Sequence, residues 1–415
     1  MNRRGEGKLE LMAPAGSFES MQAAIDSGAD SVYFGIEQLN MRAKSSINFT
    51  LDDLPEIANR CSTNGVKTYL TLNTIIYDHD LSIIKKLVDQ AKEAGITAVI
   101  ASDQAVINYA STQGMEVHIS TQLNITNIET VKFYSHFADV MVMSRELSLR
   151  QVKKICDAIE KEDVRGPSGE LIQVELFGHG ALCMAVSGKC YLSLHTHNSS
   201  ANRGACLQNC RRTYKVIDLE DGHELEIDNE YIMSPKDLCT IDFLDQVIDT
   251  GVKVLKIEGR ARAPEYVATV IKNYSDAIEA YYNKEYSQEK VKDWMTNLEK
   301  VYNRGFWSGY YLGQKLGEWT DDHGSKATRK RTYLGKGVHY FPKQKVAHFK
   351  IETKSLNVGD EILITGPTTG VIEMMVEAMR VDDKDVKEAV KGDDVTFILD
   401  KVVRPSDKIY KYEPS

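Results

Sequence analysis

Roughly the first 260 residues alternate short apolar runs with longer amphipathic stretches, a pattern typical of repeated β-strand and α-helix units. Eight of the apolar runs are predicted strands: Glu10–Ala13, Ser31–Phe34, Lys67–Leu72, Thr97–Ala101, Glu116–Ser120, Asp139–Met143, Gln173–Phe177 and Lys253–Ile257. Eight strands of one parallel series predict a (β/α)8 TIM-like barrel. An open, doubly wound sheet is the competing architecture, and the even distribution of the strands favours the barrel.

The stretches between these strands carry apolar residues at helical spacing. In the clearest one, apolar residues recur over Leu81–Val88 and the helix is expected to end before Gly95. Two further helices are predicted after the eighth strand, at Pro264–Tyr282 and at Gln288–Tyr302. The first of them has a one-sided stripe of apolar and aromatic residues, which we interpret as a packing face.

The pattern divides the chain into three parts. Residues 1–282 are predicted to form the barrel, with a long insertion at about 178–250 between the seventh and eighth strands. Loops of that length in a compact domain are usually functional. Residues 283–330 are predicted to be a helical linker, and residues 331–415 a small antiparallel β-barrel or sandwich. The strands expected in this last part are Val346–Ile351, Glu361–Thr365, Val395–Leu399 and Lys408–Tyr412.

Composition limits the class of protein. The 415 residues include 42% hydrophobic side chains, as expected of a water-soluble globular enzyme. No apolar run approaches the roughly 20 residues needed to cross a bilayer, and the N-terminus lacks the apolar core of an export signal. Seven cysteines without such a signal predict a reducing, cytoplasmic compartment.

The net charge of −9 gives no support for nucleic-acid binding, because proteins that bind nucleic acids usually carry a basic face. Two local clusters could supply one. They are Lys326, Arg329, Lys330 and Arg331, and, beside the cysteines, Arg203, Arg211 and Arg212. Each cluster could contact phosphates or could be an ordinary solvated charge run.

Four of the seven cysteines lie within 28 residues of the long insertion: Cys183, Cys190, Cys206 and Cys210. Disulfides are not expected in a reducing compartment. Four thiolates can close a tetrahedral zinc site or hold an iron–sulfur cluster, and the spacing is not that of a paired zinc ribbon. We therefore expect a metal site, and the residues alone leave structural zinc and an iron–sulfur cluster such as [4Fe–4S] both open. Cys61 and Cys156 lie on predicted helices and are expected to be core thiols.

The motif Glu175-x-Phe177-x-x-Gly180-Ala-Leu-Cys183-x4-Gly188-x-Cys190 resembles the signature of the U32 peptidase, or collagenase-like, family. The resemblance runs from about residue 9 to about residue 320. Further matching segments are Asn202-Arg-Gly-x-Cys206, Lys256-Ile-Glu-Gly-Arg260, Leu11-Met-Ala-Pro-Ala-Gly16 and Gly28-Ala-Asp-x-Val-Tyr-Phe-Gly35.

The resemblance implies a function different from the family name. Members act as oxygen-independent hydroxylases of tRNA wobble uridine, of a ribosomal RNA cytidine or of quinone precursors. The length and the C-terminal part of this chain are most similar to the tRNA branch, which makes 5-hydroxyuridine at tRNA position 34 with prephenate as a required metabolite. The family also implies that Cys239 could replace Cys210 as the fourth cluster ligand.

The carboxyl ends of the predicted strands supply the candidate catalytic residues, because active groups of such barrels lie there. The candidates are Gln122, Asn124, Arg145, His179, Glu258 and Arg260. The arginine fork suits the two carboxylates of prephenate. The sequence does not choose among Arg42, Arg145, Arg203 and Arg260 for that role.

Each of these residues also has a structural interpretation. Arg145 and Arg260 could pair with Glu146 and Glu258. The glycines beside His179 indicate a close backbone approach, yet the histidine could be a satisfied core residue. By the same reasoning, Asn73 and Asp103 could be helix caps, and His195 and His197 ordinary loop residues.

A peptidase is the alternative function, of either the metallo or the thiol type. The sequence contains no His-Glu-x-x-His zinc motif and no Gly-x-Ser-x-Gly elbow. A thiol peptidase needs one cysteine paired with a histidine rather than four grouped cysteines. A third possibility is a scaffold whose four cysteines hold structural zinc.

Overall fold

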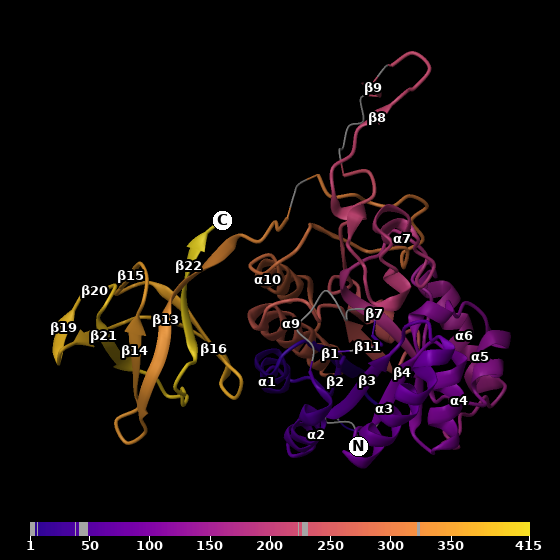
Figure 1. Ribbon diagram of the computed structural model, residues 1–415, viewed down its shortest axis with the longest axis horizontal. Coiled ribbons are helices and arrows are strands. Elements are labelled where there is room, and N and C mark those ends of the chain that lie inside the picture. Colours follow the sequence, from indigo (N-terminus) through magenta and orange to yellow (C-terminus); the bar gives the residue numbers. More distant parts are fainter. Residues whose placement is uncertain are drawn as a thin grey trace.

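The eight predicted strands form a closed barrel in the computed structural model, which describes residues 5, 7–37, 39–40, 49–222, 224–225, 231–321 and 324–415 (Figure 1). The barrel strands are β1 (Glu10–Ala15), β2 (Ser31–Phe34), β3 (Lys67–Leu72), β4 (Ala98–Ala101), β5 (Glu116–Ile119), β6 (Val140–Val142), β7 (Gln173–Ala181) and β11 (Val254–Ile257). Neighbouring strands pair in parallel, and β11 pairs with both β7 and β1. The predicted TIM-like barrel is therefore confirmed.

Helices surround the barrel. They are α1 (Phe18–Asp26), α2 (Leu54–Ser62), α3 (Leu81–Glu93), α4 (Gln104–Thr112), α5 (Ile128–Tyr134), α6 (Leu149–Lys161), α8 (Leu244–Ile248) and α9 (Pro264–Tyr282). Side chains of the preceding loops cap several of them. Ser17 accepts the backbone N–H of Ser20 and Asp103 accepts that of Ala105. These caps satisfy N–H groups that the first turn of a helix leaves unpaired, so the helix starts are encoded locally.

The strands are buried on both faces. Leu11 of β1 packs toward the helices, whereas Met12 and Tyr33 belong to a separate cluster inside the barrel with Val254 of β11. Two carboxylates also point inside, and each is paired with a lysine: Glu10 with Lys67 at 2.8 Å and Glu175 with Lys256 at 2.9 Å. The interior is therefore packed, but it is not wholly apolar.

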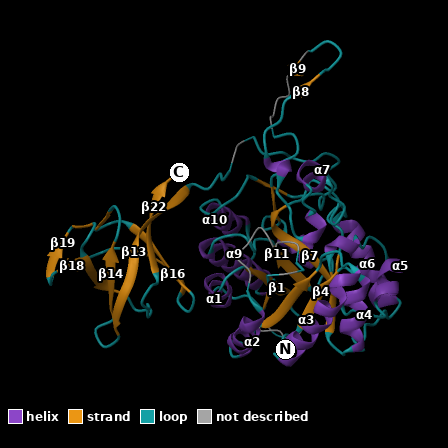
Figure 2. Cartoon of the chain, in the orientation of Figure 1, coloured by secondary structure: helices purple, strands orange, loops and turns teal. Residues whose placement is uncertain are grey.

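The insertion between β7 and β11 lies over one end of the barrel (Figure 2). It contains α7 (Leu192–His197), the short turns η4 (Ala201–Arg203) and η5 (Asn209–Arg211), the hairpin of β8 (Val216–Ile217) and β9 (Glu224–Leu225), and β10 (Asp237–Cys239). Strand β10 pairs antiparallel with the extended end of β7. The extra length of β7, which ends at Ala181 rather than at the predicted Phe177, is what provides this pairing edge.

The segment after α9 returns to the same end of the barrel. Helix α10 (Gln288–Leu298) is followed by β12 (Phe306–Trp307), which pairs in parallel with β10. Arg304 forms an ion pair with the buried Asp237 at 3.3 Å, and the Tyr311 hydroxyl donates to the Phe177 carbonyl at 2.8 Å. Residues in the range predicted as a linker therefore also form part of the barrel end.

The C-terminal part is all antiparallel β-structure, as predicted. Its strands are β13 (Arg329–Phe341), β14 (Val346–Ile351), β15 (Ser355–Asn357), β16 (Glu361–Gly366), β17 (Gly370–Met375), β18 (Met379–Val381), β19 (Lys384–Val386), β20 (Glu388–Val390), β21 (Asp394–Ile398) and β22 (Lys408–Pro414). It has its own apolar core, which includes Leu334, Phe349 and Ile364. It lies beside α1 and α9 (Figure 1), where Arg331 pairs with Glu265 at 2.8 Å.

No helix in the described part of the chain is both long enough and apolar enough to cross a membrane.

Candidate functional site

A cavity of about 610 Å³ lies at the carboxyl end of the barrel, between the strand ends and the insertion. This is the end at which barrel enzymes place their active sites. Its floor comes from Tyr33, Thr71, Phe177 and Lys256, and its cover from the insertion between residues 182 and 211. The position and the size fit a small-molecule or nucleobase site.

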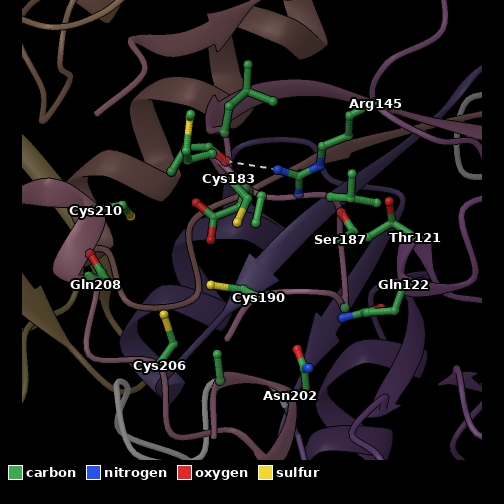
Figure 3. A pocket seen from close by; sticks show the side chains of 18 of the residues that line it. Thr121, Gln122, Arg145, Cys183, Ser187, Cys190, Asn202, Cys206, Gln208 and Cys210 are labelled. Atoms are coloured by element: carbon green, nitrogen blue, oxygen red, sulfur yellow. Dashed lines mark hydrogen bonds between the residues drawn. The ribbon is translucent and has the colours of Figure 1, made fainter. Parts of the chain in front are cut away.

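Four of the six predicted catalytic residues line this cavity: Gln122, Arg145, Glu258 and Arg260. The Arg145 guanidinium lies 3.9 Å from the Phe177 ring centre, and its Nη1 donates to the Ala181 carbonyl at 3.2 Å (Figure 3). Arg260 is almost fully buried and donates from Nη1 to Thr71 Oγ1 at 2.8 Å. Backbone and threonine partners thus hold both guanidinium groups at the cavity wall.

His179, by contrast, is not brought to the cavity wall. Its side chain is 2% exposed and packs between the rings of Tyr266, Tyr274 and Phe306. Burial, with a contribution from the Arg262 charge, lowers the pKa of His179 to about 3, so the ring is neutral at physiological pH. This environment is that of a core histidine.

The glycines on either side of His179 serve the closure of the barrel rather than ligand binding. A Cβ on Gly180 would lie 2.6 Å from the Glu258 carbonyl oxygen, and one on Gly178 would lie 2.7 Å from the Leu255 side chain. Gly180 also has a φ of +105°, which L side chains rarely adopt. The close approach predicted from the sequence is therefore between β7 and the end of β11.

Asn124 is not among the cavity-lining residues either, although it borders the site. It adopts a left-handed conformation, and its Nδ2 donates to the carbonyls of Gln122 (2.8 Å) and Ser187 (3.0 Å). Ser187 belongs to the loop between Cys183 and Cys190. Asn124 therefore ties the insertion to the end of β5.

The four clustered cysteines line the same cavity. Figure 3 shows the sulfur atoms of Cys183, Cys190, Cys206 and Cys210 around a common space. Burial raises the pKa of Cys190 and of Cys210, and the neighbouring thiols raise both further. The four thiols therefore line one common space, and we call them the thiol group.

The donor set of this thiol group is that of an iron–sulfur cluster or a tetrahedral zinc site. Among the residues that the structure describes, no three metal-binding side chains already stand in a metal-binding arrangement. The thiols fit such a group in kind and number.

Cys239 does not belong to this thiol group. It is buried in the core, with its sulfur 3.7 Å from the Tyr274 hydroxyl and 3.8 Å from the Met295 sulfur. Burial raises the pKa of Cys61, Cys156 and Cys239 to about 12 in each case. The alternative in which Cys239 replaces Cys210 is therefore not supported by the geometry.

Arginines fix the arms of the insertion. The Arg211 guanidinium donates from Nη1 to Ser234 Oγ at 3.0 Å, and from Nη2 to the Leu182 carbonyl. It therefore joins the arm of Cys210 to that of Cys183. Arg203 links the arm of Cys206 to the loop before α3, through an ion pair with Asp80.

The predicted basic clusters are largely engaged within the protein. Lys326 pairs with Asp321, Arg329 with Glu361 and Glu373, and Arg331 with Glu265. Among the described residues, Lys330 is the exposed member of that run without a carboxylate within ion-pair distance. The run therefore offers phosphate groups less charge than its composition indicates.

Sequence reasoning missed several cavity residues, notably Lys256, Arg262 and Arg304. The sequence does contain information that identifies Lys256: it is two positions after Val254 in the same strand, so its side chain faces the barrel interior.

Asn73 also lines the cavity, where its Nδ2 donates to Ser120 Oγ at 3.3 Å. Of the two insertion histidines, His195 lines the cavity and His197 is not among its lining residues.

Residues 16–321 match Peptidase family U32. The chain belongs to this family. A protein from Porphyromonas gingivalis (strain ATCC BAA-308 / W83), named Collagenase, is 57% identical over 98% of this chain and 98% of its own length.

Other U32 relatives have names that refer to RNA. The tRNA hydroxylation protein P1 of Bacillus subtilis is 29% identical over 97% of this chain and 95% of its own length. The 23S rRNA 5-hydroxycytidine C2501 synthase of Escherichia coli is 30% identical over 83% of this chain and 54% of its own length. U32 relatives therefore include both proteins named as RNA hydroxylases and proteins named as collagenases.

The two groups of cysteines should differ in reactivity in protein stripped of metal. We expect iodoacetamide to label the four cavity cysteines in the folded state, with the exposed Cys183 fastest, because the other three are half-buried. Cys61, Cys156 and Cys239 should react only after unfolding, since burial suppresses their thiolates. Peptide mapping by mass spectrometry measures each rate. Labelling of Cys239 as fast as that of Cys210 in the folded protein would contradict the assignment.

Proposed function

We propose that the protein hydroxylates RNA without oxygen, converting wobble uridine 34 of tRNA to 5-hydroxyuridine with prephenate as co-substrate. The observation that carries the proposal is the cavity itself, which is lined both by four thiols and by the Arg145 and Arg260 guanidinium groups. This pairs a site for an iron–sulfur cluster with a site for carboxylates. The RNA-directed names of full-length relatives support the choice of substrate. Such a substrate would place the enzyme in the cytoplasm.

The cavity suits an unpaired base better than a duplex. A wobble base lies in a single-stranded loop and can enter a pocket at little unstacking cost. Tyr191 lines the cavity and is 68% exposed, so its ring is available to stack on such a base at the rim. Gln122 offers an amide to the polar edge of the base. The remaining cavity volume can hold a small co-substrate beside it.

Cys183, Cys190, Cys206 and Cys210 would hold the [4Fe–4S] cluster, which would supply electron transfer at the site. Because thiolates are the ligands, binding the cluster would release protons from thiols whose pKa burial has raised. Arg145 and Arg260 would orient the two carboxylates of prephenate through their planar forks. Arg211 and Asn124 would hold the arms of the insertion in position.

A thiol peptidase is the second candidate, favoured by the Collagenase name of a 57% identical relative. A cysteine nucleophile needs a lowered pKa and a histidine base. Burial instead raises the pKa of Cys190 and Cys210, and no hydrogen bond joins a cysteine to a histidine among the described residues. The electrostatics of the cavity therefore disfavour a cysteine nucleophile.

Deletion of the gene should abolish 5-hydroxyuridine in bulk tRNA of the source organism. Mass spectrometry of tRNA nucleosides measures the loss, and re-expression of the wild-type gene should restore it. Arg145→Lys, which keeps the charge but loses the bidentate fork, should restore at most about a tenth. An unchanged nucleoside profile in the deletion strain, with gelatin cleavage by the pure protein, would instead establish the peptidase.

Anaerobically purified protein should be brown and contain iron and sulfide. Serine at any one of Cys183, Cys190, Cys206 or Cys210 should remove most of the iron, because each supplies one ligand. Cys239→Ser is the matched control and should retain full iron, because its thiol lies in the core. Iron, sulfide and zinc analysis of the five variants tests this. Colourless wild-type protein with stoichiometric zinc would show a structural zinc site.

Contacts to tRNA phosphates should come from the rim of the cavity rather than from the run at 326–331. Lys189 and Arg212 are exposed in the insertion, so the double reversal Lys189→Glu/Arg212→Glu should weaken tRNA binding. The slope of log K against log salt should become shallower by about 0.7 per lost contact. Lys154→Glu/Lys161→Glu on α6 makes the same change of charge away from the insertion and should leave binding intact. Equal loss in both variants would show that only net charge matters.

A further inference from the structure

Lys256 and Glu175 form a buried ion pair at the floor of the cavity. Lys256 lines the cavity, is 5% exposed and has its Nζ 2.9 Å from Glu175 Oε1. Glu175 is fully buried, and its Oε2 has no hydrogen-bond partner among the described residues. A buried carboxylate that uses one of its two oxygens is costly for the fold, and such sites are often functional.

The second ion pair of the barrel interior shows what a structural pair looks like. Glu10 accepts hydrogen bonds from the Ser31 and Tyr69 hydroxyls at 2.7 Å each, and from Lys67 Nζ at 2.8 Å. Both of its oxygens are used, and none of these four residues lines the cavity. In the Glu175–Lys256 pair, by contrast, one carboxylate oxygen has no hydrogen-bond partner among the described residues, and Lys256 lines the cavity. Stability alone does not explain it, because a buried pair seldom stabilises a fold more than apolar residues would.

Two guanidinium groups flank the amine. Lys256 Nζ lies 4.5 Å from the Tyr33 ring centre and 5.7 Å from that of Phe177. The Arg260 guanidinium lies 5.9 Å from the first ring, and the Arg145 guanidinium 3.9 Å from the second. The Lys256 amine and the Arg260 guanidinium therefore both lie near the Tyr33 ring. The amine and the Arg145 guanidinium both lie near the Phe177 ring.

This environment makes the ammonium easier to deprotonate. Burial lowers the pKa of Lys256, the Glu175 carboxylate raises it through its charge and hydrogen bond, and the Arg260 and Arg145 charges lower it, so that the pKa lies below its ordinary value. A lysine amine so placed becomes a nucleophile toward carbonyl carbon. The flanking guanidinium groups would hold a carboxylate attached to that carbonyl.

We propose that Lys256 forms an imine with the carbonyl carbon of a 2-oxo acid held by Arg145 and Arg260. The proposal rests on the proposed function for its biological co-substrate, since prephenate carries a 2-oxo acid side chain. Pyruvate is the simplest 2-oxo acid and is the probe of choice. It can form the imine without contacting any part of the cavity other than the amine and the two guanidinium groups.

The step balances within the residues present. Glu175 Oε1 takes a proton from the Lys256 ammonium, and the free amine attacks the carbonyl carbon. One proton of the attacking nitrogen then moves to the former carbonyl oxygen, which gives a carbinolamine. The Glu175 carboxyl then returns the proton to the departing hydroxyl group, so that water leaves and the C=N bond forms. The imine withdraws electrons from the neighbouring carbon atoms of the substrate more strongly than the carbonyl group does. Catalytic lysines that form imines act in this way.

Borohydride trapping tests the proposal on the wild-type protein. Incubation with pyruvate and sodium borohydride should give one reduced adduct per chain, located at Lys256 by tandem mass spectrometry. Glu175→Gln should slow formation of the adduct about tenfold or more, through loss of the proton acceptor. Lys256→Arg should give no adduct, and Lys67→Arg, in the other interior pair, should give the wild-type amount. Wild-type protein without an adduct, or with adducts spread over exposed lysines, would overturn the proposal.

The nucleoside assay separates this proposal from the proposed function. If Lys256→Arg folds, as judged by its circular dichroism and its thermal midpoint, it should lose 5-hydroxyuridine formation in complemented cells. Full hydroxylation by that variant would overturn the imine as a step of the reaction and leave the RNA hydroxylase standing. An adduct at Lys256 in a protein whose gene deletion leaves tRNA nucleosides unchanged would support the imine and overturn the RNA substrate.

Discussion

The closure of the barrel between β7 and β11 is the constraint on which the rest of the molecule depends. Both strands continue into the functional end: β7 leads into the cysteine insertion and β11 into the loop of Glu258 and Arg260. The end of β7 approaches the loop after β11 so closely that a Cβ on Gly180 would lie 2.6 Å from the Glu258 carbonyl oxygen. On the other side of that loop, a Cβ on Gly16, directly after β1, would lie 2.0 Å from the Arg260 carbonyl oxygen. A side chain at either glycine would push apart the two halves of the cavity wall.

The residues of the site stand on two kinds of element, which differ in rigidity. Arg145, Arg260 and Lys256 stand on strand ends whose positions the barrel fixes. The four thiols stand on loops, held in place by side chains such as Arg211 and Asn124. The proposed carboxylate site would lie on the rigid side and the proposed metal site on the adaptable side. Metal binding to the thiolates would offset the entropy lost when the loops become ordered.

The sequence predicts the barrel well because its strands are buried on both faces and give continuous apolar runs. It predicts the cavity less well, since a helix cap and a site residue look the same after a strand: Asp103 caps α4, whereas Asn73 faces the cavity. The motif around His179 predicts a site residue, but the structure encloses its side chain between aromatic residues from distant segments. The partners of Lys256 likewise come from strands far apart in the chain, and a single sequence does not show such contacts.

The order of the elements along the chain also sets the order in which the cavity can be completed. The thiols emerge from the ribosome with the arm that follows β7, before β11 has closed the barrel and before Arg304 has reached Asp237. During that interval the growing chain holds four cysteines on loops without a finished wall behind them. The wall behind the four thiols is therefore complete only after β11 has closed the barrel and Arg304 has reached Asp237.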